Sequence, residues 1–183
     1  YNRHMPESDE FWEVYWDMRL QELEDLGKRE AILAVSKLIR RLAELPDQPV
    51  RLLELGCGEG QIIGSLVEAH TQVHSIHASY GVDYSPRSIE KCRRAHSAMR
   101  FIDGDFTDPD LMANLGQFEI VLLVNALHEV FSASYSAEIG EVAVQEAKLR
   151  VELALGMAVE RLVPGGYLAL FDGLEPPGDI QEL

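Results

Sequence analysis

The sequence predicts an α/β fold, in which an open, doubly wound sheet of mainly parallel strands carries helices on both faces. From residue 50 onward, short apolar segments alternate with amphipathic ones, and turn residues separate them. This is the pattern of repeated strand–helix units. The apolar segment at residues 118–124 is continuous rather than alternating, as expected for a strand buried on both faces of a parallel sheet. The length of 183 residues, 46% of them hydrophobic, suits one compact domain with a substantial core.

The first part of the chain, residues 1–46, is predicted to form a helical cap. A helix is expected over residues 8–26, because aromatic and aliphatic residues recur there at helical spacing and Ser8 is a suitable N-cap. Gly27 ends this helix. A second amphipathic helix follows, and the two prolines of residues 46–49 stop it.

The remainder, residues 47–183, is predicted to form the sheet domain. Its strands are expected at residues 50–55, 81–84, 99–102, 118–124 and 167–171. Helices are expected over residues 61–68, after the N-cap Ser85 and Pro86, and over residues 136–162. The last of these is either one long helix or two helices joined at Gly140 or Gly156.

Composition and charge exclude several classes of function. The chain has 16 Lys and Arg residues against 31 Asp and Glu residues, and the net charge of −15 disfavours nucleic acid and anionic membranes as partners. No apolar segment approaches the roughly 20 residues of a membrane-spanning helix, and the N-terminus lacks signal-peptide features. Two cysteines, Cys57 and Cys92, build no disulfide framework, so a cytoplasmic location is expected. His70, His74 and His77 have metal-ligand spacing but lie where a helix gives way to a strand, so no metal site is expected.

The end of the first predicted strand carries a glycine cluster. In open α/β sheets, ligands bind beyond the carboxyl ends of the strands, where the strand order reverses. Gly56, Gly58 and Gly60 follow Glu54 there, and they allow the backbone to turn sharply and approach a ligand at a helix N-terminus. The pattern differs from the dinucleotide fingerprint, because Gln61 stands where that motif has its third glycine. A purely structural turn is the alternative interpretation.

The other strand ends are polar. Asp83 lies 23 residues beyond Gly60, where a carboxylate can accept both hydrogen bonds of a ribose diol. Asp105 and Phe106 offer an acid for an exocyclic amine and an aromatic face for a base. Asn125 ends the fourth strand at the centre of the crevice. These loops contain no Lys or Arg, which suits a nucleoside that carries no phosphate and has a positive centre of its own.

With these segments in this order and spacing, the chain resembles the class I S-adenosylmethionine-dependent methyltransferases over roughly residues 50–173. The segments that carry the resemblance are ELGCGEG (54–60), GVDYS (81–85), DGDF (103–106), NALHEV (125–130) and RLVPGGYLAL (161–170). The resemblance implies a Rossmann-like methyltransferase fold, S-adenosyl-L-methionine as the cofactor and a methyl acceptor as the second substrate.

The resemblance also implies a set of cofactor-binding residues. Those expected at the methionine portion and the sulfonium are Glu54, Gly56, Cys57, Gly58, Gly60 and Asn125. Those expected at the ribose and adenine are Asp83, Tyr84, Asp105 and Phe106. Among them, Glu54 would organise the amino end of the ligand, Asp83 would hold the ribose hydroxyls and Asp105 would bond the adenine amine.

Two features depart from the family pattern. The family sheet normally continues after the fifth strand with a helix and an antiparallel pair, but the chain ends at Leu183. The two antiparallel strands are therefore expected to be missing, together with part of the substrate wall, and the connection before the fifth strand is longer than usual. N-terminal helices often act as lids in this family, so Trp12, Tyr15 and Trp16 are interpreted either as part of a lid or as core packing against the sheet.

The candidate catalytic residues follow the fourth strand. Methyl transfer depends on alignment of the acceptor with the methyl group, and a general base is needed only when the acceptor must lose a proton. His128 is the first candidate for that base, with Glu129 to orient it, and Asp172 is the second candidate. The alternative is that His128 shapes the pocket or caps the following segment.

The predicted function is transfer of a methyl group to an oxygen or nitrogen atom of a small molecule. One alternative is a non-catalytic methyltransferase-like domain that serves as a partner subunit or as a module of a larger protein. Another is a nucleotide-dependent oxidoreductase, which the residue Gln61 disfavours because the dinucleotide fingerprint is incomplete. Neither the identity of the acceptor nor the oligomeric state is predicted.

Overall fold

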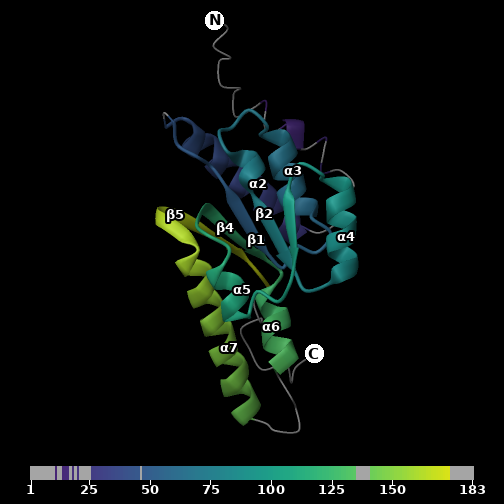
Figure 1. The fold of residues 1–183 in the computed structure, drawn as a ribbon, viewed down its shortest axis with the longest axis vertical. Helices are drawn as coiled ribbons and strands as arrows, with labels where there is room; N and C mark the ends of the chain where they lie inside the picture. Colours follow the sequence, from purple (N-terminus) through teal and green to yellow (C-terminus); the bar gives the residue numbers. More distant parts are fainter. Residues whose placement is uncertain are drawn as a thin grey trace, which may run out of the picture.

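The structure is a computed structural model that describes residues 11, 14–16, 18, 20, 26–45, 47–134 and 141–173. These residues form a five-stranded sheet with helices on both faces (Figure 1). The predicted α/β fold is therefore confirmed. Most of the helix expected over residues 8–26, including Ser8 and Trp12, lies outside the described residues, as does the chain beyond Gly173.

All neighbouring strands of the described sheet run parallel, in the order β3-β2-β1-β4-β5. The strands are β1 (Leu52–Leu55), β2 (Tyr80–Asp83), β3 (Arg100–Asp103), β4 (Phe118–Val124) and β5 (Leu162–Phe171). Because β1 pairs with both β2 and β4, the strand order reverses beside β1, and this creates a crevice at the carboxyl ends. The strand β5 begins before Tyr167, where it was predicted to start, because its proline–glycine segment continues along β4 with a shift of register.

Beyond the helical residues 14–16, further helical segments accompany the strands. They are α2 (Leu26–Ala43), α3 (Gln61–Ala69), the 3₁₀ helix η1 (Ile76–Ala78), α4 (Pro86–Ala95), α5 (Pro109–Ala113), α6 (Leu127–Ser134) and α7 (Glu141–Glu160). Neither α5 nor α6 was among the helices expected from the sequence. A local signal for α5 exists, since Asp108 caps it by accepting a hydrogen bond from the Asp110 amide at 2.9 Å. The cap of α6 is Asp172, a residue distant in sequence, and no local pattern marks it.

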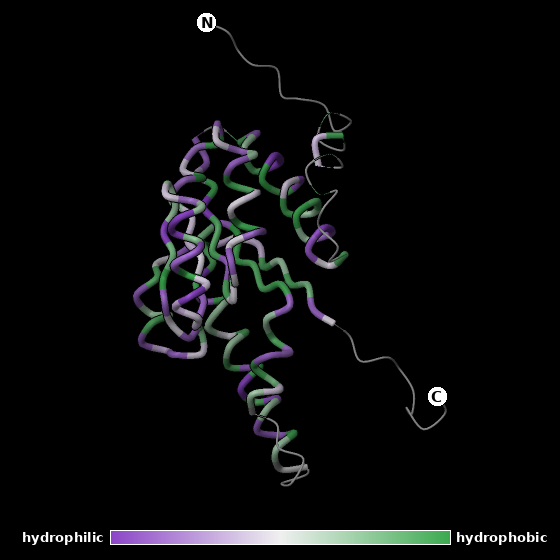
Figure 2. Tube along the Cα trace, turned by 90° about the vertical axis from the view of Figure 1, so that its right-hand side faces the viewer, coloured by the Kyte–Doolittle hydropathy of each residue, from purple (hydrophilic) through white to green (hydrophobic). Residues whose placement is uncertain are grey.

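Two hydrophobic cores lie on opposite faces of the sheet. On one face, α2, α3 and α4 pack against residues such as Leu52 and Leu122. On the other, α5, α6 and α7 pack against residues such as Leu53 and Leu123. Most residues of β1 and β4 therefore enter one core or the other in turn, and both strands are buried along their whole length. The strands are largely hydrophobic in Figure 2.

A buried chain of hydrogen bonds joins Trp16 to α2 and to the end of α3. Trp16 is 1% exposed, and its indole Nε1 donates to Ser36 Oγ of α2 at 2.8 Å. Ser36 Oγ in turn lies 2.9 Å from Nε2 of His70, the residue that ends α3. Burial, helped by the charge of Arg40, lowers the pKa of His70 to about 4, so the ring is neutral at pH 7. For Trp16, the structure supports core packing rather than a lid.

The histidines with metal-like spacing do not share a helix face, because α3 ends at Ala69 and His77 lies in η1. The described residues contain no group of three or more His, Cys, Asp or Glu side chains that could hold a metal ion. None of the described helices is long and apolar enough to cross a membrane.

Candidate functional site

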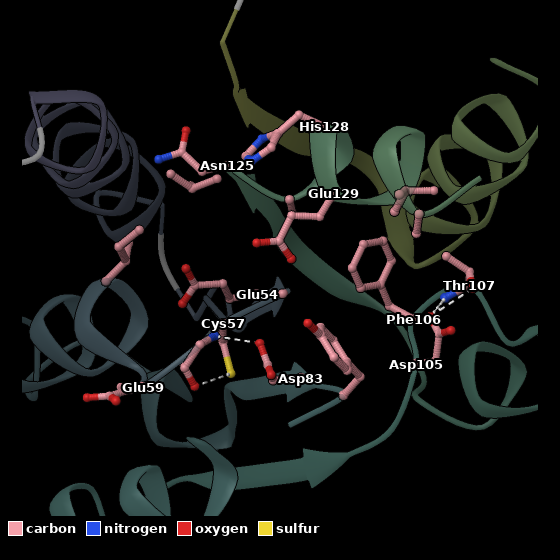
Figure 3. A pocket seen from close by; sticks show the side chains of 18 of the residues that line it. Glu54, Cys57, Glu59, Asp83, Asp105, Phe106, Thr107, Asn125, His128 and Glu129 are labelled. Atoms are coloured by element: carbon pink, nitrogen blue, oxygen red, sulfur yellow. Dashed lines mark hydrogen bonds between the residues drawn. The ribbon is translucent and has the colours of Figure 1, made fainter. Parts of the chain in front are cut away.

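A cavity of about 520 Å³ opens at the carboxyl ends of the strands (Figure 3), a volume typical of small-molecule sites. All but two of the predicted site residues line it, the exceptions being Gly60 and the second candidate base, Asp172. Those that do are Glu54, Gly56, Cys57, Gly58, Asp83, Tyr84, Asp105, Phe106, Asn125, His128 and Glu129. Residues from several separate segments of the sequence thus meet at the predicted crevice.

The glycine loop between β1 and α3 forms the floor of the cavity. Gly56, Gly58 and Gly60 have positive φ angles of 74°, 53° and 74°, which L side chains rarely adopt. A Cβ atom on Gly58 would meet no atom within 4 Å, so its backbone faces open space that a ligand can approach. A Cβ on Gly60 would instead lie 3.1 Å from Cys92 Sγ. Gly60 therefore allows the turn and packs closely against Cys92, and it does not line the cavity.

Asp83 links the glycine loop to the end of β2. Its Oδ2 accepts a hydrogen bond from the Gly58 amide at 2.7 Å, and its Oδ1 accepts one from the Ser85 amide at 2.9 Å. An ionised carboxylate has about four acceptor positions, so each oxygen retains one. Two acceptor positions on adjacent oxygens fit a vicinal diol such as that of a ribose.

Glu54 is almost fully buried beneath the loop. It is 1% exposed, and its Oε2 accepts a hydrogen bond from the Ile63 amide of α3 at 3.1 Å. Burial raises its pKa to about 8, although the Ile63 hydrogen bond and the charge of Lys28 act in the opposite direction. Figure 3 shows the carboxylates of Glu54, Asp83 and Glu129 around the same space. A ligand that brings a cationic group to this end of the cavity would favour the ionised form of Glu54 and lower its pKa.

The opposite end of the cavity combines an acid with two aromatic rings. Asp105 Oδ1 accepts hydrogen bonds from the amide and the hydroxyl of Thr107, both at 2.8 Å, and its Oδ2 has no partner among the described residues. Phe106 is largely buried, whereas Tyr84 is 67% exposed, and both line the cavity. This set of side chains suits a flat ring that carries an amino group.

His128 and Asp172 form a hydrogen-bonded pair at the remaining wall. His128 Nδ1 lies 2.6 Å from Asp172 Oδ1, and Asp172 Oδ2 accepts hydrogen bonds from the amides of Leu127 and His128 at 2.8 and 3.2 Å. The expectation that Glu129 orients His128 is therefore corrected, since Asp172 takes that position. The physical reason is helical geometry, because neighbouring residues on a helix point in different directions.

Two cationic side chains that were not expected from the sequence also line the cavity. Lys28 of α2 donates to Gln61 Oε1 at 3.2 Å, and Arg150 reaches the cavity from α7. The strand-end loops contain no cation, as expected, but the site as a whole is not free of them. Both residues come from helices far from the motifs, and no feature of the sequence marks either one.

The residues that line the cavity fit S-adenosylmethionine on the chemistry of their donor and acceptor sets. Asp83 has acceptor positions available for a diol, Gly58 leaves room for close approach, and Glu54 is a buried acid whose raised pKa a cationic group would lower. Asp105 and Phe106 suit an amino-substituted ring at the far end.

Comparisons with known proteins agree with this fit. A family model described as a methyltransferase domain matches residues 52–148, just over half of the chain. CalS10, an amino pentose methyltransferase from Micromonospora echinaspora solved with S-adenosylmethionine, is similar in structure with a TM-score of 0.59 and 22% identity. The match covers 97% of this chain and 62% of CalS10.

Two further solved structures show the same fold. The sugar N-methyltransferase KedS8 from Streptoalloteichus has a TM-score of 0.58 and 20% identity over 98% of this chain and 59% of its own. The CMeT domain of the citrinin polyketide synthase has a TM-score of 0.55 and 22% identity over 89% of this chain and 39% of its own. The chain thus spans about six-tenths of the length of CalS10 and KedS8. No protein of curated function matches the sequence. The chain belongs to the class I S-adenosylmethionine-dependent methyltransferases, a family whose cofactor is S-adenosylmethionine.

Proposed function

We propose that the chain transfers a methyl group from S-adenosylmethionine to an oxygen or nitrogen atom of a small molecule, with His128 as general base. One observation carries the proposal: His128 lines the cavity, and its Nδ1 is hydrogen-bonded to Asp172 Oδ1. Nε2 has no hydrogen-bond partner among the described residues, so it is available to accept a proton. Such a base serves acceptors that arrive as an alcohol, a phenol or a protonated amine.

The cofactor-binding part of the proposal assigns one task to each wall of the cavity. Asp83 would hold the ribose hydroxyls, Asp105 the adenine amino group, and Glu54 the amino end of the methionine portion. Tyr84 and Phe106 would flank the adenine. The remaining residues, Gly56, Cys57, Gly58 and Asn125, would border the methionine portion and the sulfonium. When bound, the cofactor supplies an electrophilic methyl group on a positively charged sulfur.

The rest of the cavity would shape the acceptor site. Substitution at a methyl carbon requires the acceptor atom to lie in line with the carbon–sulfur bond, so alignment in a dry cavity provides much of the rate enhancement. The residues 1–46 would form a cap over a core formed by residues 47–183. CalS10 and KedS8 act on sugars, as their names state, and this supports a small polar acceptor.

The test is an acceptor screen with matched variants. The purified chain is incubated with S-adenosylmethionine and a library of small alcohols, phenols and amines, and S-adenosylhomocysteine and products heavier by one methylene unit are detected by mass spectrometry. His128→Gln should lower turnover about a hundredfold or more, while the affinity for S-adenosylhomocysteine stays unchanged. His77→Gln, which alters an exposed histidine that does not line the cavity, should keep full activity. Full activity of His128→Gln would contradict the role of His128.

A chain that binds S-adenosylhomocysteine and turns over no acceptor in the screen would argue against catalysis. That result would instead favour a partner subunit or a module of a larger protein.

A further inference from the structure

We propose that Asp172 is a positioning residue that holds the neutral His128 ring with its proton on Nδ1, so that Nε2 carries the lone pair that receives the proton of the acceptor. The inference rests on the proposed function and deepens it. It assigns to the end of β5 a task in the reaction, in addition to its place in the sheet.

The hydrogen bonds around Asp172 determine the direction of its contact with His128. Oδ1 lies 2.6 Å from His128 Nδ1 and 2.9 Å from the Gly173 amide nitrogen. Oδ2 accepts from the amides of Leu127 and His128. An ionised carboxylate has no proton to donate, so the bond to His128 exists only when Nδ1 carries the proton. The lone pair of the neutral ring then lies on Nε2.

The surroundings keep Asp172 in the ionised form that this geometry needs. Burial alone would raise the pKa of Asp172, but the hydrogen bonds from His128 and from the three backbone amides outweigh burial and lower it. The Asp172 side chain is 15% exposed and the His128 side chain 53%. The acid is thus held inside the protein while the ring reaches into the cavity.

The same residue fixes the position of the base relative to the sheet. Asp172 follows β5 directly, and its Oδ2 binds the first amides of α6, which begins after β4. The backbone amide of Asn125 also donates to the Phe171 carbonyl oxygen at 2.8 Å, so the ends of β4 and β5 are joined beside His128. The orientation of His128 is therefore set by both its backbone and its ring.

In the proton step, the O–H or N–H bond of the acceptor breaks and its proton goes to Nε2 of His128. The electron pair left on the acceptor atom forms the bond to the methyl carbon, and the pair of the carbon–sulfur bond stays on sulfur. His128 becomes an imidazolium ion whose charge Asp172 balances from the Nδ1 side. The ring returns to neutrality by giving the Nε2 proton to water.

The variant Asp172→Asn separates positioning from a merely structural role. Two backbone amides donate at the Oδ2 position and one, from Gly173, donates at the Oδ1 position. The pair at Oδ2 therefore selects the oxygen of the new amide group, and the hydrogen bond from Gly173 is lost. The amide nitrogen then faces His128 Nδ1 and donates to it, which moves the ring proton to Nε2. The substitution thus preserves the shape and the cap of α6 but reverses the tautomer, an effect that is severe where a carboxylate orients a catalytic histidine.

The variant Asp172→Ala provides the contrast, because it removes the cap and leaves the ring free to adopt both tautomers. If Asp172 positions the proton, Asp172→Asn should lose at least as much kcat as Asp172→Ala, about a hundredfold or more, with little change in KM. If Asp172 serves only the structure, Asp172→Asn should be the milder variant, and that order would overturn the proposal.

A spectroscopic measurement tests the same point without an acceptor. Two-bond ¹⁵N–¹H spectra of the histidine-labelled protein distinguish a protonated ring nitrogen from a bare one, and His128→Gln identifies the signal. The wild-type protein should show protonated Nδ1 and bare Nε2, and Asp172→Asn should show the reverse. A bare Nδ1 in the wild type would overturn the proposal. The expected tautomer combined with full activity of His128→Gln would instead contradict the proposed base and leave the positioning intact.

Discussion

The buried carboxyl group of Glu54 makes the stability of the cofactor-free protein depend on pH. Burial is the largest influence on this group, and it raises the pKa from 4.5 to about 8. A group with a raised pKa in the folded state contributes stability that is fully present below the unfolded-state pKa. That contribution is lost as the pH rises through the folded-state pKa. The folded protein should therefore weaken steadily between these two values as Glu54 is forced to ionise.

The magnitude follows from the size of the pKa difference. Each pKa unit corresponds to about 1.4 kcal/mol, so the free energy of unfolding should lose about 4 kcal/mol through Glu54 between pH 5 and pH 9. Glu54→Gln keeps the acceptor for the Ile63 amide and removes the titration. The difference in unfolding free energy between Glu54→Gln and wild type should thus grow by about 4 kcal/mol, in favour of the variant, over that range.

The assay is urea unfolding of the cofactor-free protein at several pH values, with wild type and variant measured side by side. Glu119→Gln is a matched control, because Glu119 is also buried but is ion-paired with Arg51 at 2.8 Å. Breaking that pair, whose arginine side chain is 33% exposed, should destabilise the protein by about 1.5–3 kcal/mol. A difference between Glu54→Gln and wild type that stays constant from pH 5 to pH 9 would refute the reasoning.

Two other predictions concern the cofactor and the buried histidine. Asp83→Ala should weaken binding of S-adenosylhomocysteine by about 1.5–3 kcal/mol, as expected for lost charge-assisted hydrogen bonds. Calorimetry measures this change in affinity. Unchanged affinity in a folded variant would remove Asp83 from the site. Burial lowers the pKa of His70 in the folded state from its ordinary value of 6.5 to about 4. Protonation therefore favours the unfolded chain, and stability is lost as the pH falls through this window. Relative to His70→Gln, the wild type should lose about 2 kcal/mol of unfolding free energy between pH 7 and pH 5, and a constant difference in urea unfolding would show that His70 does not titrate differently on folding.

The strand-end residues of the site could be predicted because each belongs to a local motif. A glycine cluster after a strand, or an acid at a strand end, places its side chain at a known edge of a parallel sheet. This is why Gly58, Asp83 and Asp105 were found from the sequence and meet in one cavity.

No local motif predicts the pairing of His128 with Asp172. The two residues are distant in sequence and come together only because β5 lies beside β4. Glu129 was the nearer acid, but adjacent residues on a helix point apart. Lys28 and Arg150 were missed for the related reason that single cations on helices carry no pattern, and the helix α6 was missed because its cap comes from another strand.

The central claim is that the cavity binds S-adenosylmethionine or its product, and calorimetric titration with S-adenosylhomocysteine tests it most directly. NAD serves as the control ligand, and Asp83→Ala serves as the control protein. We expect micromolar binding of S-adenosylhomocysteine, weaker binding by the variant and no heat of binding with NAD. Binding of NAD, or no binding of S-adenosylhomocysteine to the folded chain, would contradict it.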